Sequence, residues 1–265
     1  MNIRLLAYAV LSTVCSSLAA DTPAGTPSAA NLAAELSSLR QDPATYVRLR
    51  MDIKTPSGTP TVLQIQIKER HTKGSAELMY QVLWPKERKG ESVLLRKADG
   101  RGASGAVWVP PDAVRTLDSS KMKEAIFGSD LSYEDIVDDF FAWEQQALVG
   151  NEPVNRVNCV ILESKPGKGE HSSFARIRTW VDAKRMVPLR IEKYGPAGQL
   201  LRRIETMDVV KDGSHYIPAK LSIQGSRKDS LTELDGSRIK HDVTYSDQDF
   251  SAEALKLLTI PRSAP

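Results

Sequence analysis

The alternation of apolar and polar residues between Ser173 and Ile223 constrains the fold of this chain more than any other feature. Within it, Val187, Leu189 and Ile191 alternate with polar or charged neighbours, as in a strand with one buried and one solvated face. Similar runs are Ala175–Val181 and Ile217–Ile223. Short turns separate the runs, and Asp212-Gly213 is typical of a tight hairpin. We therefore predict a four-stranded antiparallel meander, whose apolar face needs a covering layer or a ligand.

Alternating runs continue on both sides of this meander. Further strands are predicted at Val47–Ile53, Leu63–Ile67, Leu78–Trp84, Ser92–Leu95, Ala106–Val109, Gln145–Val149, Val154–Ser164 and Ile239–Tyr245. A sheet of about eleven antiparallel strands is more than one flat sheet carries comfortably. The sequence therefore predicts an α+β domain built on a strongly curved sheet.

A helical segment is predicted in the middle of the chain. Ser132 and Asp135 have the spacing of a capping box, and Leu131 with Ile136 that of a hydrophobic staple. The apolar residues that follow are spaced as one stripe: Tyr133, Ile136, Val137, Phe140 and Phe141. We expect a helix from Ser132 to Phe141 that lies on an apolar surface. Shorter helical pieces are predicted at Leu32–Leu39, Lys121–Phe127 and Phe250–Leu255.

The N-terminus has the pattern of a secretory signal peptide. A basic start, a short apolar run and small residues at Ala19-Ala20 predict cleavage that removes residues 1–20. A membrane anchor would need about 20 apolar residues, and a lipoprotein signal would need a small residue before Cys15. Residues 21–30 form a flexible leader, and residues 31–265 are expected to form a single domain. The protein is thus expected in the periplasm, with Cys159 as a buried structural thiol.

The sequence lacks the motifs of common enzymes. It has no Gly-x-Ser-x-Gly, His-Glu-x-x-His or Cys-x-x-Cys, and no phosphate-binding loop. The four histidines are far apart, and the net charge of +3 is interleaved along strands. We therefore expect no enzyme activity, no cofactor, no metal and no nucleic acid, and a monomer.

Two groups of residues fit both a structural and a functional interpretation. Asp130, Glu134 and Asp135 fit helix capping, which the spacing favours, or acid–base chemistry and cation binding. The tryptophans fit either a ligand groove or an ordinary core. They are Trp84, Trp108, Trp143 and Trp180.

The order of several motifs resembles one family. The motifs are Trp108-Val109-Pro110, Gly128-Ser129-Asp130-Leu131-Ser132-Tyr133-Glu134-Asp135, Trp180-Val181-Asp182 with Pro188-Leu189-Arg190, and Phe250-Ser251 before Leu255. Together they resemble the outer-membrane lipoprotein-sorting-protein-like family, which is related to the LolA/LolB carriers, over Leu36 to Ile260. The resemblance implies an open half-barrel whose concave apolar face is closed by helices and accepts acyl chains.

The expected function is that of a periplasmic carrier or binding protein for a lipid, a lipoprotein or another amphiphile, held between sheet and helices. The alternative is a non-enzymatic envelope module, such as an accessory subunit of an exporter or a sensor of a membrane partner. Expected partners are lipid or acylated protein cargo, with an inner-membrane transporter or an outer-membrane acceptor. Candidate ligand-binding residues are Leu49, Met51, Leu63, Ile65, Tyr80, Trp108, Ile136, Phe140, Phe141, Ile177, Leu189 and Ile191.

Overall fold

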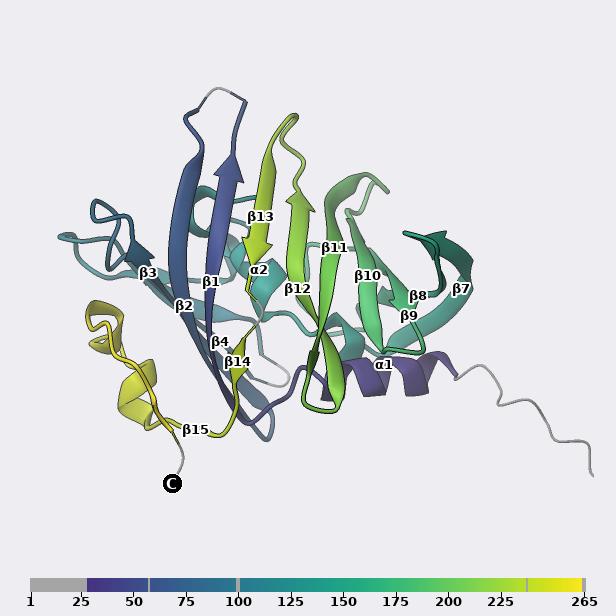
Figure 1. Cartoon of the computed structure of the whole chain (residues 1–265), viewed down its shortest axis with the longest axis horizontal. Coiled ribbons are helices and arrows are strands. Elements are labelled where there is room, and N and C mark those ends of the chain that lie inside the picture. Colours follow the sequence, from purple (N-terminus) through teal and green to yellow (C-terminus); the bar gives the residue numbers. More distant parts are fainter. Residues whose placement is uncertain (1–27, 57, 99–100, 237, 264–265) are drawn as a thin grey trace, which may run out of the picture.

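A single curved and unclosed sheet dominates the computed structural model, which describes residues 28–56, 58–98, 101–236 and 238–263 (Figure 1). Fourteen strands pair in this sheet, all of them antiparallel. The predicted signal peptide and most of the predicted leader lie outside the described residues. The leader prediction extends slightly too far, because a helix already begins at Ala29.

The sheet consists of two meanders joined side by side. The first contains β1 (Ala44–Lys54), β2 (Thr61–Thr72), β3 (Ser75–Trp84), β4 (Ser92–Ala98), β5 (Ser104–Trp108) and β6 (Arg115–Leu117). The second contains β7 (Gln145–Val154), β8 (Val157–Lys165), β9 (Arg176–Asp182), β10 (Val187–Tyr194), β11 (Leu200–Asp212), β12 (His215–Gln224) and β13 (Leu231–Asp235). Strand β13 pairs with β1, so β6 and β7 form the two edges, and β14 (Ile239–Lys240) adds to β1. A separate pair is β15 (Val243–Thr244) with β16 (Arg262–Ser263).

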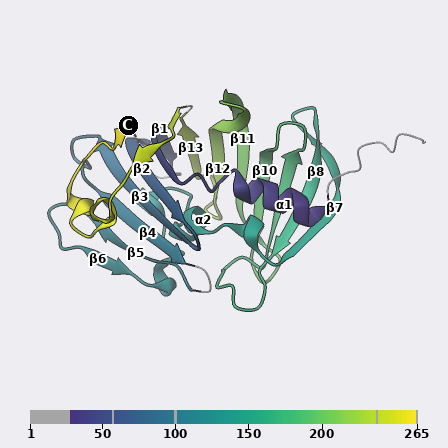
Figure 2. The same ribbon diagram turned by 90° about the horizontal axis from the view of Figure 1, so that it is seen from below.

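The connection between β6 and β7 crosses the sheet from one edge to the other (Figure 2). We call residues 118–144 the crossing segment. Its helical pieces are η1 (Ser119–Lys121), η2 (Ile126–Gly128), α2 (Tyr133–Val137) and η3 (Phe140–Ala142), where η denotes a short 3₁₀ turn. Helix α1 (Ala29–Ser38) packs on η3 and β7, and two turns, η4 (Asp247–Phe250) and η5 (Ala254–Lys256), follow near the C-terminus.

The crossing segment packs on one face of the sheet, which we call the inner face. Its Tyr133 and Val137 pack with Leu78 and Leu95 of β3 and β4. The opposite, outer face of the same strands carries Met79 and Leu94, covered by Phe250 and Leu255 of the C-terminal turns. Strands β3 and β4 are therefore buried on both faces, because successive residues of a strand point to opposite sides.

The predicted four-stranded meander is confirmed as β9 to β12, which are neighbours in this order. The hairpin turn after Asp212 is also confirmed, because Gly213 has φ of 57°. The count of about eleven strands was too low, since β6 and β13 were not predicted. The single strand predicted over Ile239–Tyr245 is wrong, because Asp242 adopts φ of 52° and separates β14 from β15.

One face of β10 was assigned wrongly from the sequence. The pairing with β9 shifts register between Pro188 and Arg190, which leaves Leu189 as the extra residue of a bulge. Val187 and Leu189 therefore pack with Trp180 on the outer face, whereas Ile191 packs on the inner face. Alternation alone could not predict this change of side, because a bulge inverts it.

The predicted helix from Ser132 to Phe141 is also wrong in its second half. Helix α2 ends at Val137, and Asp138 has an extended backbone, with ψ of 126°. The carboxylate of Asp138 lies 2.7 Å from Lys97 Nζ, and Asp139 accepts a hydrogen bond from the Phe141 amide that begins a new turn. Contacts with a distant strand thus end the helix, and the apolar stripe divides between two clusters.

Of the three remaining helical predictions, one is confirmed and two hold in position but not in helix type. The helix predicted over Leu32–Leu39 is confirmed as α1, whereas the pieces predicted at 121–127 and 250–255 are short 3₁₀ turns. Cys159 is fully buried beside Trp180 and Leu189, and its burial raises the pKa of the thiol. It is a core residue, as expected.

Candidate functional site

A cavity of about 400 Å³ opens between the inner face and the crossing segment. The ends of β2, β3 and β4 form one side, and the end of α1 with α2 and η3 forms the other. Its floor is apolar and consists of Ala76, Leu78, Ile136 and Val137. Its rim is charged and consists of Arg40, Glu69, His71, Lys97, Arg101, Asp139 and Glu170. An apolar floor below a charged rim suits an amphiphile, since each end of such a ligand meets matching groups.

Ion pairs fix much of this rim. Lys97 Nζ lies 2.7 Å from Asp138 Oδ1 and 3.6 Å from Glu170 Oε2, while Arg40 Nη1 lies 3.5 Å from Asp139 Oδ1. Burial raises the pKa of Asp138 in spite of Lys97. Burial acts to lower the pKa of Lys97, but its two acidic neighbours raise it. Lys97 therefore stays charged at the rim.

Helix α2 forms the wall of the cavity, and its first turn is capped as the sequence predicts. Ser132 Oγ accepts a hydrogen bond from the Asp135 amide at 3.2 Å, and Asp135 Oδ2 accepts one from the Ser132 amide at 2.8 Å. These bonds satisfy amides that the helix itself leaves without partners. The capping box is confirmed.

Asp135 also anchors the wall to the second meander. Its carboxylate lies 2.9 Å from Lys193 Nζ of β10 and 2.9 Å from Arg202 Nη2 of β11. Lys193 is only 1% exposed, and its ammonium lies 4.9 Å from the ring centroid of Phe174 and 5.4 Å from that of Phe140. Burial acts to raise the pKa of Asp135, but the two cations outweigh burial and lower it to about 2. Asp135 is therefore ionised at any physiological pH.

Asp130 and Glu134 make further buried contacts that helix capping does not explain. Asp130 accepts hydrogen bonds from Ser230 Oγ at 2.7 Å and from Thr232 Oγ1 at 2.9 Å. Glu134 accepts bonds from Ser172 Oγ at 2.8 Å and from the Ser173 amide at 2.5 Å. Capping therefore accounts only for Asp135. The three carboxylates together fasten the crossing segment to strands and loops far away in sequence.

The twelve predicted ligand-binding residues do not form one site. Five lie together on the inner face of the first meander: Leu49, Met51, Leu63, Ile65 and Tyr80. Four belong to the cluster below α1: Phe140, Phe141, Ile177 and Ile191. Ile136 alone lines the cavity. Trp108 and Leu189 were assigned to the wrong face, because they pack on the outer face in separate clusters.

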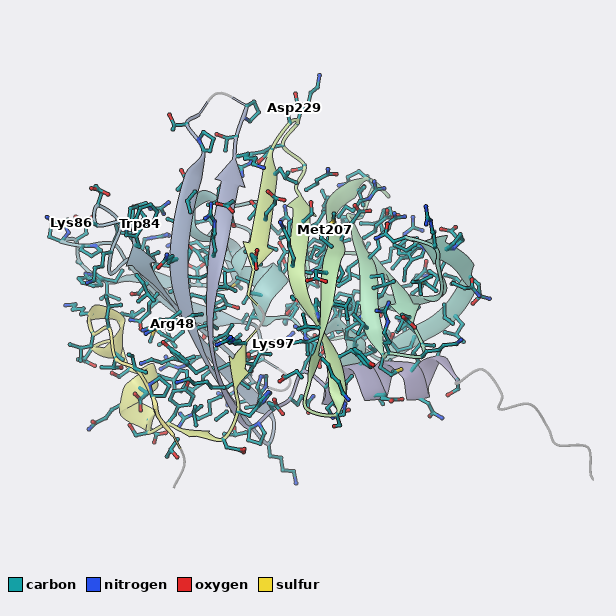
Figure 3. All side chains as sticks on the ribbon, in the orientation of Figure 1. Arg48, Trp84, Lys86, Lys97, Met207 and Asp229 are labelled. Atoms are coloured by element: carbon teal, nitrogen blue, oxygen red, sulfur yellow. The ribbon has the colours of Figure 1, made fainter. Side chains whose placement is uncertain are left out.

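The four tryptophans do not share a groove either. Trp143 is buried below α1, Trp180 lies on the outer face, and Trp84 is 51% exposed (Figure 3). They lie in different parts of the sheet, so the interpretation as a common ligand lining is wrong.

Sequence reasoning missed the charged residues of the site. Lys193 follows Ile191 by two positions and so shares its face of β10, which places a charge in an apolar register. That mismatch was a usable signal for a buried ion pair. Lys97 and Arg101 gave no comparable signal, because they lie at a strand end where charged residues are ordinary. In the part of the chain that the structure describes, no group of three or more His, Cys, Asp or Glu residues could hold a metal ion.

The chain is similar to one protein family in sequence and to several solved structures in fold. A family model described as "-like: Uncharacterized protein" matches residues 51–257. No curated protein matches the chain significantly. Among solved structures, a DUF1329 family protein from Desulfovibrio piger is 24% identical, with a TM-score of 0.79 over 86% of this chain and 97% of its own.

Two further structures have the same fold. An outer membrane lipoprotein-sorting protein domain from Vibrio parahaemolyticus is 17% identical, with a TM-score of 0.77, covering 86% of this chain and 98% of its own. A LolA superfamily protein from Nitrosomonas europaea is also 17% identical, with a TM-score of 0.69, covering 86% of this chain and 100% of its own. At these identities the similarity establishes the open curved sheet.

Proposed function

This chain belongs to the family whose model matches residues 51–257, and it has a LolA-like fold. From this premise, and from the resemblance of its motifs to the outer-membrane lipoprotein-sorting-protein-like family, we propose that it carries or binds an amphiphile in the periplasm. The ligand is a lipid, a lipoprotein or another acylated molecule. The observation that carries the proposal is the cavity of about 400 Å³ between the inner face and the crossing segment. Small-molecule pockets commonly measure about 300–1,000 Å³.

The apolar end of the ligand would lie against the inner face, which is the concave face in this proposal, with α1, α2 and η3 covering it. The floor residues Leu78 and Val137 belong to a cluster that also contacts Tyr80. Tyr80 in turn packs with Met51 and Leu63, among the predicted lining residues. An acyl chain that enters at the floor would extend toward these residues when η3 and α1 move aside. Each methylene that leaves water contributes about 0.8 kcal/mol.

The polar end of the ligand would remain at the rim. Arg40, Lys97 and Arg101 offer donors there, and Glu69 with Glu170 offer acceptors. This mixture suits a polar or zwitterionic head group. A rim whose charges all had the same sign would instead select head groups of the opposite charge.

Export to the periplasm is part of the proposal and rests on the signal-peptide pattern of residues 1–20. None of the described helices has the length and apolar character needed to cross a membrane. We expect mature protein to begin at Ala20 or Asp21. An acyl carrier in this compartment would receive cargo from an inner-membrane transporter and deliver it to an outer-membrane acceptor.

The cavity can be tested with two matched tryptophan variants. Ile136→Trp fills the floor, whereas Met207→Trp adds the same side chain at an exposed position of β11 (Figure 3). We expect Ile136→Trp to weaken binding of a fluorescent fatty acid by roughly tenfold or more and Met207→Trp to leave it unchanged. Lipid extracted from gently purified wild type and identified by mass spectrometry names the ligand.

Two results would contradict a carrier. One is a wild type that binds no fatty-acid probe and yields no lipid. The other is equal weakening by the two variants, which would place the probe away from the cavity. An empty protein that instead retains a stoichiometric envelope protein would favour the interaction module.

A further inference from the structure

A second pocket of about 400 Å³ lies on the outer face, where β1, β13 and β14 meet. Its lining residues are Tyr46, Arg48, Asp235, Gly236, Arg238 and Lys240. Tyr46 and Arg48 alternate along β1 with Leu49 and Met51, which face the inner side. This outer pocket therefore shares no residue with the inner cavity and opens on the opposite side of the sheet.

The outer pocket concentrates positive charge. Arg48, Arg238 and Lys240 contribute three cations against the single carboxylate of Asp235. Within the described residues, none of the three cations forms an ion pair with a carboxylate. The next outward-facing cation on β1 differs, because Arg50 Nε lies 2.9 Å from Asp52 Oδ2. The charge of Arg50 is thus neutralised by Asp52, whereas the pocket keeps a net positive charge.

The side chains of Tyr46 and Arg48 are held in place before any ligand binds. The hydroxyl of Tyr46, whose side chain is buried, donates to Gln66 Oε1 at 3.0 Å and accepts from Arg48 Nε at 2.7 Å. Gln66 in turn donates to Gln81 Oε1 at 2.9 Å. The Lys240 ammonium lies 5.9 Å from the Tyr46 ring centroid, and the Arg48 guanidinium lies 5.8 Å from it. A buried polar chain therefore fixes Arg48, and Arg48 and Lys240 lie beside the same aromatic ring.

Gly236, which directly follows β13, allows the chain to pass close to β1. A Cβ atom at this position would lie 2.7 Å from Leu49 Cβ and 3.2 Å from the Arg48 carbonyl oxygen. Only glycine allows the two backbones to approach this closely. The approach brings Arg238 and Lys240 back beside Arg48.

We propose that this outer pocket binds a phosphate group. The Arg48 Nε atom is already engaged by Tyr46, so its two terminal nitrogens remain for a ligand, and Arg238 offers a second guanidinium. Guanidinium groups bind phosphate oxygens in a bidentate manner, and a lysine adds a point charge. A phosphate monoester or diester would match the net charge of the lining. The group comes either from a phospholipid head group or from a soluble phosphate compound.

The experiment compares two single substitutions that remove the same charge from the same face of one strand. Arg48→Gln alters the pocket, whereas Arg50→Gln removes a cation already paired with Asp52. Binding of inorganic phosphate is measured by calorimetry. Binding to vesicles is measured by sedimentation, with phosphatidylglycerol mixed into phosphatidylcholine and with phosphatidylcholine alone.

We expect wild-type protein to bind phosphate or the anionic vesicles, and Arg48→Gln to weaken this binding by roughly tenfold. Arg50→Gln should change it little. Phosphate binding that displaces the protein from vesicles indicates a site for any phosphate, while vesicle binding alone indicates a lipid head group. Arg48→Lys keeps the positive charge but loses the bidentate guanidinium group, so it should bind with intermediate affinity. It also controls for misfolding of Arg48→Gln.

Two results would overturn the proposal. One is a wild type that binds neither phosphate nor anionic vesicles, and the other is an equal loss in Arg48→Gln and Arg50→Gln, which would indicate general surface charge. The fatty-acid probe should bind Arg48→Gln normally, because the inner cavity is untouched. Failure of the outer pocket is therefore distinguishable from failure of the carrier proposal.

Discussion

The two halves of the crossing segment are held to the rest of the protein by different combinations of contacts. Helix α2 has a buried ionic anchor, through Asp135 with Lys193 and Arg202, in addition to the apolar packing of its other side chains. Turn η3 is held mainly by apolar packing, since Phe140 and Phe141 lie against α1 in one cluster. The aromatic rings touch each other with centroids 4.4 Å apart.

This difference indicates which part of the wall can move. A buried ion pair has one good geometry, and separating it leaves uncompensated charges in a poorly solvating interior. Apolar contacts weaken gradually and can be replaced by an acyl chain of similar character. We therefore interpret α2 as the fixed part of the wall and η3 with α1 as the part that ligand entry displaces.

The largest effect is expected where the ionic anchor is broken. Asp135→Ala leaves Lys193 and Arg202 without their carboxylate, so we expect a loss of about 3–5 kcal/mol in the free energy of unfolding, measured with urea. The double variant Asp135→Leu with Lys193→Met removes the charges of these two residues and leaves that of Arg202. It should therefore recover part of this loss. A loss below about 1 kcal/mol in Asp135→Ala would remove the contrast between the two halves.

The same anchor predicts acid sensitivity. The pKa of Asp135 is lowered to about 2 in the folded protein, below its value of about 3.9 in an unfolded chain. Its stabilising contribution is therefore complete above the unfolded pKa and is lost as pH falls toward 2. Unfolding measured between about pH 5 and pH 2 should show a smaller decline in the double variant than in wild type.

An intermediate effect is expected in the apolar half. Phe141→Ala should weaken binding of a fluorescent fatty acid more than it lowers thermal stability, because the ring forms part of the displaceable wall. The matched control is Phe250→Ala, which removes an equally buried ring from the outer face and should cost about 3–5 kcal/mol without affecting the probe. If Phe141→Ala melts earlier but binds the probe normally, η3 is ordinary core.

The smallest effect is expected at His241, outside the crossing segment. Its ring nitrogens lie 2.7 Å from Asp42 and 2.7 Å from Asp212, and it links the start of β1 to the β11–β12 hairpin. Burial acts to lower its pKa, but the two carboxylates outweigh burial and raise it. The contribution is thus complete below about pH 6.5 and is lost as pH rises through the folded pKa.

Because His241 is well exposed, His241→Gln should lower stability by less than about 1 kcal/mol at low pH and change it little at high pH. Thermal unfolding of the two proteins, compared at about pH 5.5 and pH 8.5, measures this difference. A difference of equal size at both values would show that protonation plays no part.

The sequence predicted what depends on local pattern and missed what depends on distant partners. Alternation and turn residues predicted β9 to β12, and Ser132 predicted the start of α2. The end of α2 depends on Lys97, which lies 41 residues away from Asp138 along the chain. The bulge at Leu189 and the buried position of Lys193 also depend on pairing with neighbouring strands. Of the cavity floor only Ile136 was predicted, because Leu78 joins it only in the folded chain.

The crossing segment connects the two edge strands of an open, curved sheet, so its length and the curvature of the sheet are linked (Figure 2). Fully extended, it would reach roughly 90 Å, but its turns and α2 shorten it. Flattening of the curved sheet increases the distance between β6 and β7 and therefore stretches the crossing segment. Widening of the sheet and unwinding of the crossing segment are thus coupled. A bulky ligand in the cavity would change both together.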